Sequence, residues 1–170
     1  MHPYVQLAQQ AVAEHFLDGT NLKTANKLPA ELANVRAGVF VTIYNGVALR
    51  GCIGTIAPTK KNIAKEIITN TISAATSDYR FNPITASELP ELNFEISVLS
   101  RPEPAASLAD LDPKKYGVIV QAGLKRGLFL PDLEGIVDVE KQVLIAAQKA
   151  GIDLDLEEIK LSRFTVAKYK

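Results

Sequence analysis

The sequence predicts an α+β fold. Apolar residues recur at helical spacing in some segments and alternate in others, and Asn45-Gly46 separates two alternating segments, as in a tight β-hairpin. The predicted strands are joined partly by hairpins and partly by helices, with no regular β-α-β order and no internal repeat. We therefore expect antiparallel sheets with helices on them rather than a doubly wound parallel sheet.

Local patterns define each element of the first hundred residues. Gly19 ends the helical spacing of the N-terminal segment, and Thr59 and Thr85 are residue types that cap helices. Leu92 to Leu99 alternates apolar and polar residues, which is typical of a strand with one buried face. In chain order we expect a helix over 3–17, strands over 38–44 and 47–56, a helix over 60–77, a loop over 78–83, a short turn over 85–89 and a strand over 92–99.

The remaining chain is predicted in the same way. Three prolines indicate that the segment 101–113 runs over the surface, and Asp138 and Gly151 are suited to begin and end a helix. In chain order we expect strands over 118–121 and 128–130 around a connection at 123–127, a helix that Asp138 caps and that ends at Ala150, and a last strand over 159–166.

Composition describes an ordinary globular domain. The chain has 170 residues, of which 47% are hydrophobic and 22% charged. A domain of this size buries enough surface to fold without a disulfide or a structural metal. Nineteen Lys and Arg residues against nineteen Asp and Glu residues give a net charge of zero, which makes duplex nucleic acid the weakest candidate partner.

The N-terminal segment and the histidine and cysteine counts exclude several functions. The first seventeen residues lack the uninterrupted apolar core of a signal peptide, and no run is long enough to span a membrane. With a single cysteine, Cys52, no internal disulfide can form, and we expect a cytoplasmic protein. The chain has only two histidines, His2 and His15, both in this N-terminal segment, so zinc sites built on several His or Cys ligands are excluded.

The segment Arg50-Gly51-Cys52-Ile53-Gly54-Thr55 carries the most information. Glycine inside a strand indicates a bulge or the close approach of another backbone or a ligand. If Asn45-Gly46 is a two-residue turn, Cys52 lies opposite Val39, Arg50 lies opposite Val41, and Arg50 shares a face with Cys52. A guanidinium beside a thiol favours the thiolate. Cys52 is then a candidate nucleophile, metal ligand or redox thiol.

A second interpretation of the same residues is structural. Cys52 would pack on Val39 in the core, and Arg50 would pair with a carboxylate such as Glu95, which is otherwise expected to be a solvated strand residue. The segment contains no histidine to act as the base of a cysteine nucleophile. Arg80, in the following loop, either contacts an anionic ligand or pins the loop through a salt bridge. The candidate binding residues are Arg50, Gly51, Cys52, Ile53, Gly54, Thr55 and Arg80.

Two other charged segments have ordinary structural interpretations. Lys125-Arg126-Gly127 is either a small basic patch or a hairpin loop, and Lys60-Lys61 lies on a surface helix. The chain contains no phosphate-binding Walker loop, no dinucleotide fingerprint and no paired CxxC motif. We therefore predict no cofactor.

Several motifs together resemble the AMMECR domain family, also called AmmeMemoRadiSam system protein A. The resemblance spans nearly the whole chain and is most specific in the segment Leu49 to Thr55, which contains LRGCIG. The other matching segments are Asp78 to Ile84, Glu88-Leu89-Pro90, Phe94 to Leu99, Tyr116-Gly117-Val118, Gly123 to Pro131 and Lys149-Ala150-Gly151.

The resemblance implies one intracellular domain over 1–170, with a larger and a smaller subdomain that are each a layer of helices on an antiparallel sheet. It supplies no established activity, but prokaryotic members accompany Memo-like and radical SAM proteins or are fused to them. Arg50, Gly51, Cys52, Gly54 and Arg80 map onto motif positions that line a shared cleft. Many members also carry a Gly-Trp pair and a second cysteine near the last helix, where this chain has no tryptophan and has alanines at 146 and 147. A two-cysteine redox or metal site is therefore not expected.

Two functional hypotheses follow. The first is a binding or adaptor component that acts with Memo-like and radical SAM proteins through a cleft lined by the LRGCIG strand and the Arg80 loop. The second is an enzyme, or an enzyme subunit, that uses Cys52 as a nucleophile or redox thiol beside Arg50 on a small anionic substrate. The first is favoured because the motif lacks a general base.

Overall fold

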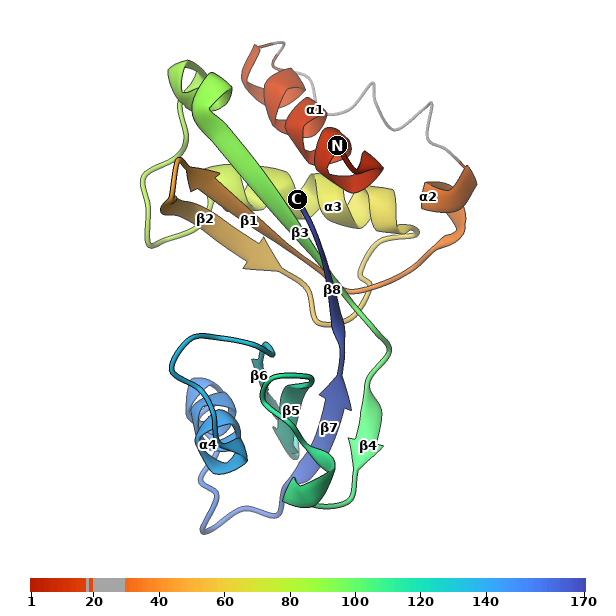
Figure 1. Cartoon of the computed structure of the whole chain (residues 1–170), viewed down its shortest axis with the longest axis vertical. Helices are drawn as coiled ribbons and strands as arrows, with labels where there is room; N and C mark the ends of the chain where they lie inside the picture. The colour runs from red at the N-terminus through yellow and green to blue at the C-terminus, as the bar shows by residue number, and fades with distance from the viewer. Residues whose placement is uncertain (18, 20–29) are drawn as a thin grey trace. The chain divides into compact units, whose positions relative to one another are not determined.

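The computed structural model describes residues 1–17, 19 and 30–170. The chain forms two compact units, one of residues 1–99 with 167–170 and one of residues 100–166. A four-stranded sheet with strand order β2-β1-β3-β8 belongs to the first unit, and another with order β4-β7-β5-β6 to the second. The strand pairs with a described register are antiparallel. These sheets, with their helices, confirm the predicted α+β fold (Figure 1).

In the first unit, two long helices lie on the same face of the sheet. Figure 1 shows α1 and α3 on that face. The elements of this unit are α1 (Pro3–Leu17), α2 (Ala30–Asn34), β1 (Val39–Asn45), β2 (Ala48–Gly54), α3 (Ile63–Thr76), η2 (Ala86–Glu91), β3 (Leu92–Leu99) and β8 (Val166–Tyr169). The predicted first helix and the strand over 92–99 are confirmed with the expected bounds.

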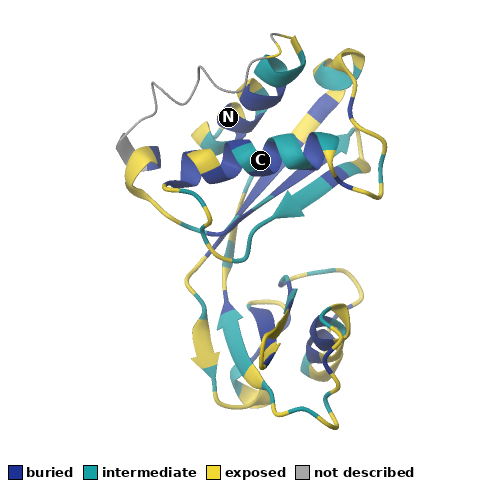
Figure 2. Cartoon of the chain, turned by 180° about the vertical axis from the view of Figure 1, so that it is seen from behind, coloured by how far each residue is buried: buried dark blue, intermediate teal, exposed yellow. Residues whose placement is uncertain are grey.

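The core of this unit follows from the alternation of β1. Val39, Val41 and Ile43 point to one face and are completely buried, as period-two alternation requires. They meet the apolar face of α3, where Ile63 and Ile67 are also completely buried. Figure 2 shows the dark blue residues of α1 and α3 turned toward the sheet. The opposite face of the sheet carries the even-numbered residues of β1.

The start of α3 differs from the prediction. The helix begins at Ile63 and not at Lys60, and its cap is Asn62, whose side chain accepts a hydrogen bond from the Lys65 N–H at 3.0 Å. Thr59 cannot cap it, because its N–H and its hydroxyl both donate to the carboxylate of Glu66, at 2.8 Å each. The helix therefore starts one turn later than the apolar pattern indicates.

The predicted register of the hairpin is also wrong. Asn45 pairs with Ala48 and Tyr44 with Leu49, but the next pair is Ile43 with Gly51. Arg50 is the extra residue of a β-bulge, in which two residues of one strand oppose one of the other. The turn is Gly46-Val47 and not Asn45-Gly46, which shifts the register by two residues, and the bulge shifts it by one more, so Cys52 pairs with Thr42 and not with Val39.

The second unit is a smaller layered structure. It contains β4 (Glu103–Ala105), η3 (Leu108–Asp110), β5 (Gly117–Ala122), β6 (Lys125–Phe129), α4 (Val139–Lys149) and β7 (Lys160–Phe164). Asp138 caps α4 as predicted, with Oδ1 accepting the Lys141 N–H at 2.6 Å. The predicted connection over 123–127 is too long, since Lys125, Arg126 and Gly127 belong to β6 and pair with β5. The expected surface segment over 101–113 contains β4 and η3.

The last predicted strand, over 159–166, is two strands. β7 ends at Phe164 and pairs with β4 and β5, whereas β8 begins at Val166 and belongs to the other sheet. Thr165 separates them, and its N–H is bound by the Ser100 hydroxyl at 2.9 Å. No helix among the described residues is long and apolar enough to cross a membrane.

Candidate functional site

The loop after α3 is hydrogen-bonded to the open edge of β2. β2 is an outer strand of its sheet, so the N–H and C=O of Cys52 have no partner strand on that side. Asp78 Oδ2 accepts the Cys52 N–H at 2.9 Å, and Arg80 Nη2 donates to the Cys52 carbonyl at 3.3 Å. The two side chains thus take the place of a neighbouring strand at this one residue.

Asp78 and Arg80 also bind each other. The Arg80 guanidinium donates from Nε to Asp78 Oδ1 at 2.9 Å and from Nη2 to Asp78 Oδ2 at 2.7 Å. These hydrogen bonds hold the pKa of the Asp78 carboxyl well below its usual range, against the opposing effect of burial, and the Cys52 N–H adds to the lowering. Asp78 is buried and Arg80 is half exposed, so the pair presents a guanidinium to the surface.

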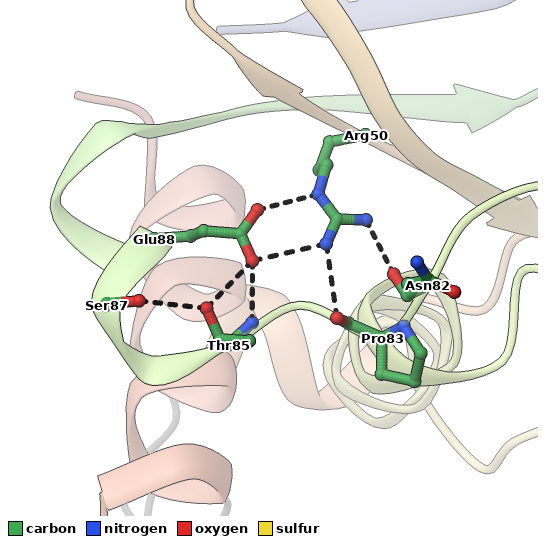
Figure 3. Close-up of polar contacts among 6 residues, drawn as sticks. All are labelled: Arg50, Asn82, Pro83, Thr85, Ser87 and Glu88. Atoms are coloured by element: carbon green, nitrogen blue, oxygen red, sulfur yellow. Dashed lines mark hydrogen bonds and ion pairs between the residues drawn. The ribbon is translucent and has the colours of Figure 1, made fainter.

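Arg50 binds the same loop further along. Its Nε donates to Glu88 Oε1 at 2.7 Å and its Nη2 to Glu88 Oε2 at 3.2 Å, which is a bidentate ion pair (Figure 3). The remaining donors reach the carbonyl oxygens of Asn82, at 2.7 Å, and Pro83, at 3.2 Å. The bulge therefore directs one guanidinium to both the loop and η2.

Glu88 also caps the start of η2. Its Oε2 accepts the N–H and the hydroxyl of Thr85, at 2.8 and 3.0 Å, and so completes the capping box of η2 (Figure 3). The Arg50 guanidinium, followed by the Thr85 N–H, lowers the pKa of the Glu88 carboxyl to about 2. Glu88 is therefore ionised throughout the physiological range.

Substituting Arg50→Lys is expected to destabilise the protein by about 2 kcal/mol, because an ammonium cannot contact the carboxylate and both carbonyls at once. The stability from Glu88 is present above its ordinary pKa and is lost as the pH falls toward about 2, since its folded pKa is the lower one. Urea unfolding at pH 7 and pH 3 tests this. The difference between wild type and Arg50→Lys should shrink at pH 3, and an equal difference at both values would contradict the ion pair as its source.

The six residues from Arg50 to Thr55 do not share one surface. Gly51 lies under the backbone of α3, and Ile53 pairs with Val41 and packs against the core. Thr55 donates its hydroxyl to Glu66 Oε1 at 2.7 Å. Gly54, on the other face, lies against the Phe40 ring.

Cys52 and Arg50 are engaged with different partners. Cys52 is half-buried, and its Sγ lies 3.3 Å from Thr42 Oγ1. Among the described residues, no hydrogen bond or ion pair joins Arg50 to Cys52, so the expected contact of guanidinium and thiol is not seen. Arg50 does pair with a carboxylate, as the structural interpretation expects, but that carboxylate belongs to Glu88 and not to Glu95.

Glu95 is not the solvated strand residue that was expected. Its side chain is 10% exposed, and Oε2 lies 3.0 Å from Lys170 Nζ. Thr42 pairs with Cys52 on one side and with Glu95 on the other. A thiol, a hydroxyl and a carboxylate thus lie side by side on β2, β1 and β3, on the face of the sheet opposite α3. No group of three or more His, Cys, Asp or Glu residues that could hold a metal ion occurs in the described parts of the chain.

Comparisons with known proteins identify the family. The family model described as AMMECR1 matches residues 5–169. The chain belongs to the AMMECR1 family. A protein of Thermotoga maritima is 46% identical over 99% of this chain and 98% of its own length. A protein of Clostridium acetobutylicum is 43% identical over 99% of this chain, which spans only 36% of that longer protein. The crystal structure of an uncharacterised protein of Pyrococcus horikoshii has a TM-score of 0.83 and 32% identity, covering 97% of this chain and 88% of that one.

In this member of the AMMECR1 family, the positions considered for a second cysteine have a packing role. Ala146 and Ala147 of α4 are completely buried in the core of the second unit. The carbonyl oxygen of Ala146 lies where a side chain at Gly127 would be. Small residues at these positions allow α4 to approach the sheet closely.

Three residues of the site were not singled out from the sequence. Asp78 binds the edge of β2, and Glu88 binds Arg50. Tyr79 lies between Asp78 and Arg80 in the sequence and is 96% exposed. All three lie in or beside segments that match the AMMECR domain family, but the residues themselves give only local signals, namely the Asp-x-Arg spacing and the Thr-x-x-Glu pattern of a capping box. Neither pattern indicates that the partner is a strand about thirty residues away.

Proposed function

We propose that this chain is a binding component that acts with Memo-like and radical SAM proteins. Its recognition surface is formed by the loop that carries Tyr79 and Arg80, together with the edge of the LRGCIG strand at Cys52 to which that loop is attached. The observation that carries the proposal is an almost fully exposed tyrosine in a loop that is held in place on both sides. Tyrosine and arginine are the residue types that contribute most to binding at protein interfaces.

The fixed conformation of the loop supports recognition. Asp78 and Arg80 attach the loop to Cys52, and Arg50 attaches it at Asn82 and Pro83. A partner therefore does not have to order the loop, and that saves conformational entropy on binding. The Arg80 guanidinium also lies 5.4 Å from the centre of the Phe81 ring, which restricts its motion further.

The test is the capture of purified Memo-like and radical SAM proteins from the same genome by the immobilised chain. Tyr79→Ala is expected to weaken binding about tenfold, the loss typical of an interface tyrosine. Leu124→Ala is the matched control, because Leu124 is also fully exposed but lies in the turn between β5 and β6. The wild-type chain must capture at least one of the two proteins. Absence of capture, or equal capture by Tyr79→Ala, would overturn the proposal.

A second candidate is the enzyme hypothesis, in which Cys52 acts on a small anionic substrate. One observation favours it: the thiol is partly accessible and lies beside the Thr42 hydroxyl. Against it, the guanidinium of Arg50 binds Glu88 and two carbonyls and makes no hydrogen bond to Cys52. Cys52→Ser separates the candidates, since an adaptor keeps partner capture. Alkylation of the native chain across pH, with the denatured chain as reference, reports whether the thiol reacts in the folded state.

A further inference from the structure

The second unit contains a cavity that the proposed function does not use. Its volume is about 410 Å³, within the usual range of small-molecule sites. Two segments form its walls, one from Ser100 to Glu103 and one from Arg163 to Thr165, and Tyr116 completes it. The walls are tied together by backbone, because the Ser100 N–H donates to the Thr165 carbonyl at 2.9 Å and the Thr165 N–H donates to the Ser100 hydroxyl at 2.9 Å.

Arg163 presents a guanidinium that is fixed but has unused donors. It stacks on the Tyr116 ring, 4.5 Å from the ring centre, and its Nη1 donates to the Asp110 carbonyl at 2.7 Å. Its buried Nε has no acceptor among the described residues. Its Nη2 lies 3.7 Å from Glu103 Oε2, which is longer than a hydrogen bond. The side chain is 29% exposed, so solvent or a ligand can reach the group.

Arg101 supplies a second guanidinium to the same cavity. It is exposed, and its guanidinium makes no hydrogen bond or ion pair within residues 1–17, 19 and 30–170, although its carbonyl oxygen accepts the Ser100 hydroxyl at 3.4 Å. Glu103 is the acidic residue of the lining, and its side chain is 70% exposed. The cavity therefore has two cationic groups and one carboxylate, and that carboxylate is free to turn outward.

We propose that this cavity binds a small molecule through an oxyanion group, either a phosphate or a carboxylate. A guanidinium matches the planar or tetrahedral arrangement of such oxygens with two parallel N–H donors. Arg163 is held in place before binding, and Arg101 closes on the anion from the other wall. Glu103 competes with the anion for Arg163, so the site is weakened by a carboxylate of the chain itself.

Isothermal titration calorimetry of the full chain tests the proposal with two probes, inorganic phosphate and acetate, at constant ionic strength. Arg101→Ala is expected to weaken binding about tenfold, the effect of one charge-assisted hydrogen bond. Glu103→Gln is expected to strengthen it about threefold, because an exposed competing charge is removed. Arg126→Ala, which removes an exposed cation of β6, is the control and should leave binding unchanged.

Unchanged binding in Arg126→Ala separates this site from general attraction of anions, because the loss of any exposed cation would weaken such attraction. Saturable binding of phosphate alone assigns a phosphorylated ligand, and saturable binding of acetate alone assigns a carboxylate ligand. Arg101 has no partner to lose, so a folding defect is not expected for Arg101→Ala, and its melting temperature checks this. Absence of saturable binding of both probes, unchanged affinity in Arg101→Ala or weaker binding in Glu103→Gln would overturn the proposal.

Discussion

Replacing Gly51 with alanine is expected to destabilise the first unit by about 3 kcal/mol, the cost of overpacking a well-filled core. A Cβ atom at this position would lie well inside the van der Waals contact distance to the Ala74 carbonyl oxygen. That oxygen belongs to the backbone of α3 and not to a flexible side chain, so the whole helix must move away from β2. The buried contacts of Ile67 and Ile68 would loosen with it. Urea unfolding of the variant measures the loss.

Two further glycines provide matched comparisons for Gly51→Ala. Gly127 of β6 lies in the same way under the Ala146 carbonyl of α4, so Gly127→Ala should cost a similar amount in the second unit. Gly123 has a φ of +55° and nothing within 4 Å of an added Cβ. Gly123→Ala should therefore cost only about 1 kcal/mol of backbone strain. If Gly51→Ala cost no more than Gly123→Ala, the close approach of α3 to β2 would not be what requires glycine.

The elements that the sequence predicted correctly are those that local interactions define. Asp138 binds the N–H of a residue three positions later, and Glu88 binds Thr85 three positions earlier, so these helix starts can be recognised from spacing. The strand over 92–99 alternates without interruption because one face lies on the core. The glycines of the segment from Arg50 to Thr55 predicted a bulge or a close approach, and both occur, the bulge at Arg50 and the approach of the α3 backbone to Gly51.

The bulge and the division of the last strand arise from contacts between distant residues. The bulge at Arg50 is stabilised by Glu88, Asn82 and Pro83, which are more than thirty residues away, and it adds one residue to the register shift that the turn makes. The last strand divides at Thr165, where it leaves one sheet for the other. Neither event changes the alternation of apolar residues. Patterns within a segment therefore predict its type, whereas its register and its partners depend on the rest of the chain.

Glu66 illustrates such a contact, and its removal is the second large effect that we expect. The side chain is 1% exposed, and its carboxylate accepts four hydrogen bonds. Oε1 accepts the hydroxyls of Thr55 and Thr59, and Oε2 accepts the N–H groups of Thr59 and Lys60, all between 2.7 and 2.8 Å. One carboxylate on α3 thus holds the segment that leads from β2 into the helix. Glu66→Ala should lower the free energy of unfolding by about 3 kcal/mol, because these donors lose their acceptor.

Glu66→Gln is the discriminating variant. Its amide oxygen can replace Oε2 and accept both N–H groups, while its NH₂ can donate to the two hydroxyls, which are able to accept. Glu66→Gln should therefore lower the free energy of unfolding by about 1 kcal/mol, the difference between a charged and a neutral hydrogen bond. A loss as large as that of Glu66→Ala would show that the charge itself is required.

The pH dependence of stability gives an independent check on Glu66. Burial raises the pKa of its carboxyl, but the hydrogen bonds from Thr55, Lys60 and Thr59 outweigh burial and hold that pKa below its ordinary value. A carboxyl with a lowered pKa in the folded state stabilises the protein above its unfolded pKa and loses this contribution as the pH falls through the folded value. Glu66→Gln has no such group. Its stability relative to wild type should therefore improve on acidification, because protonation of the wild-type carboxyl removes the advantage of the charge.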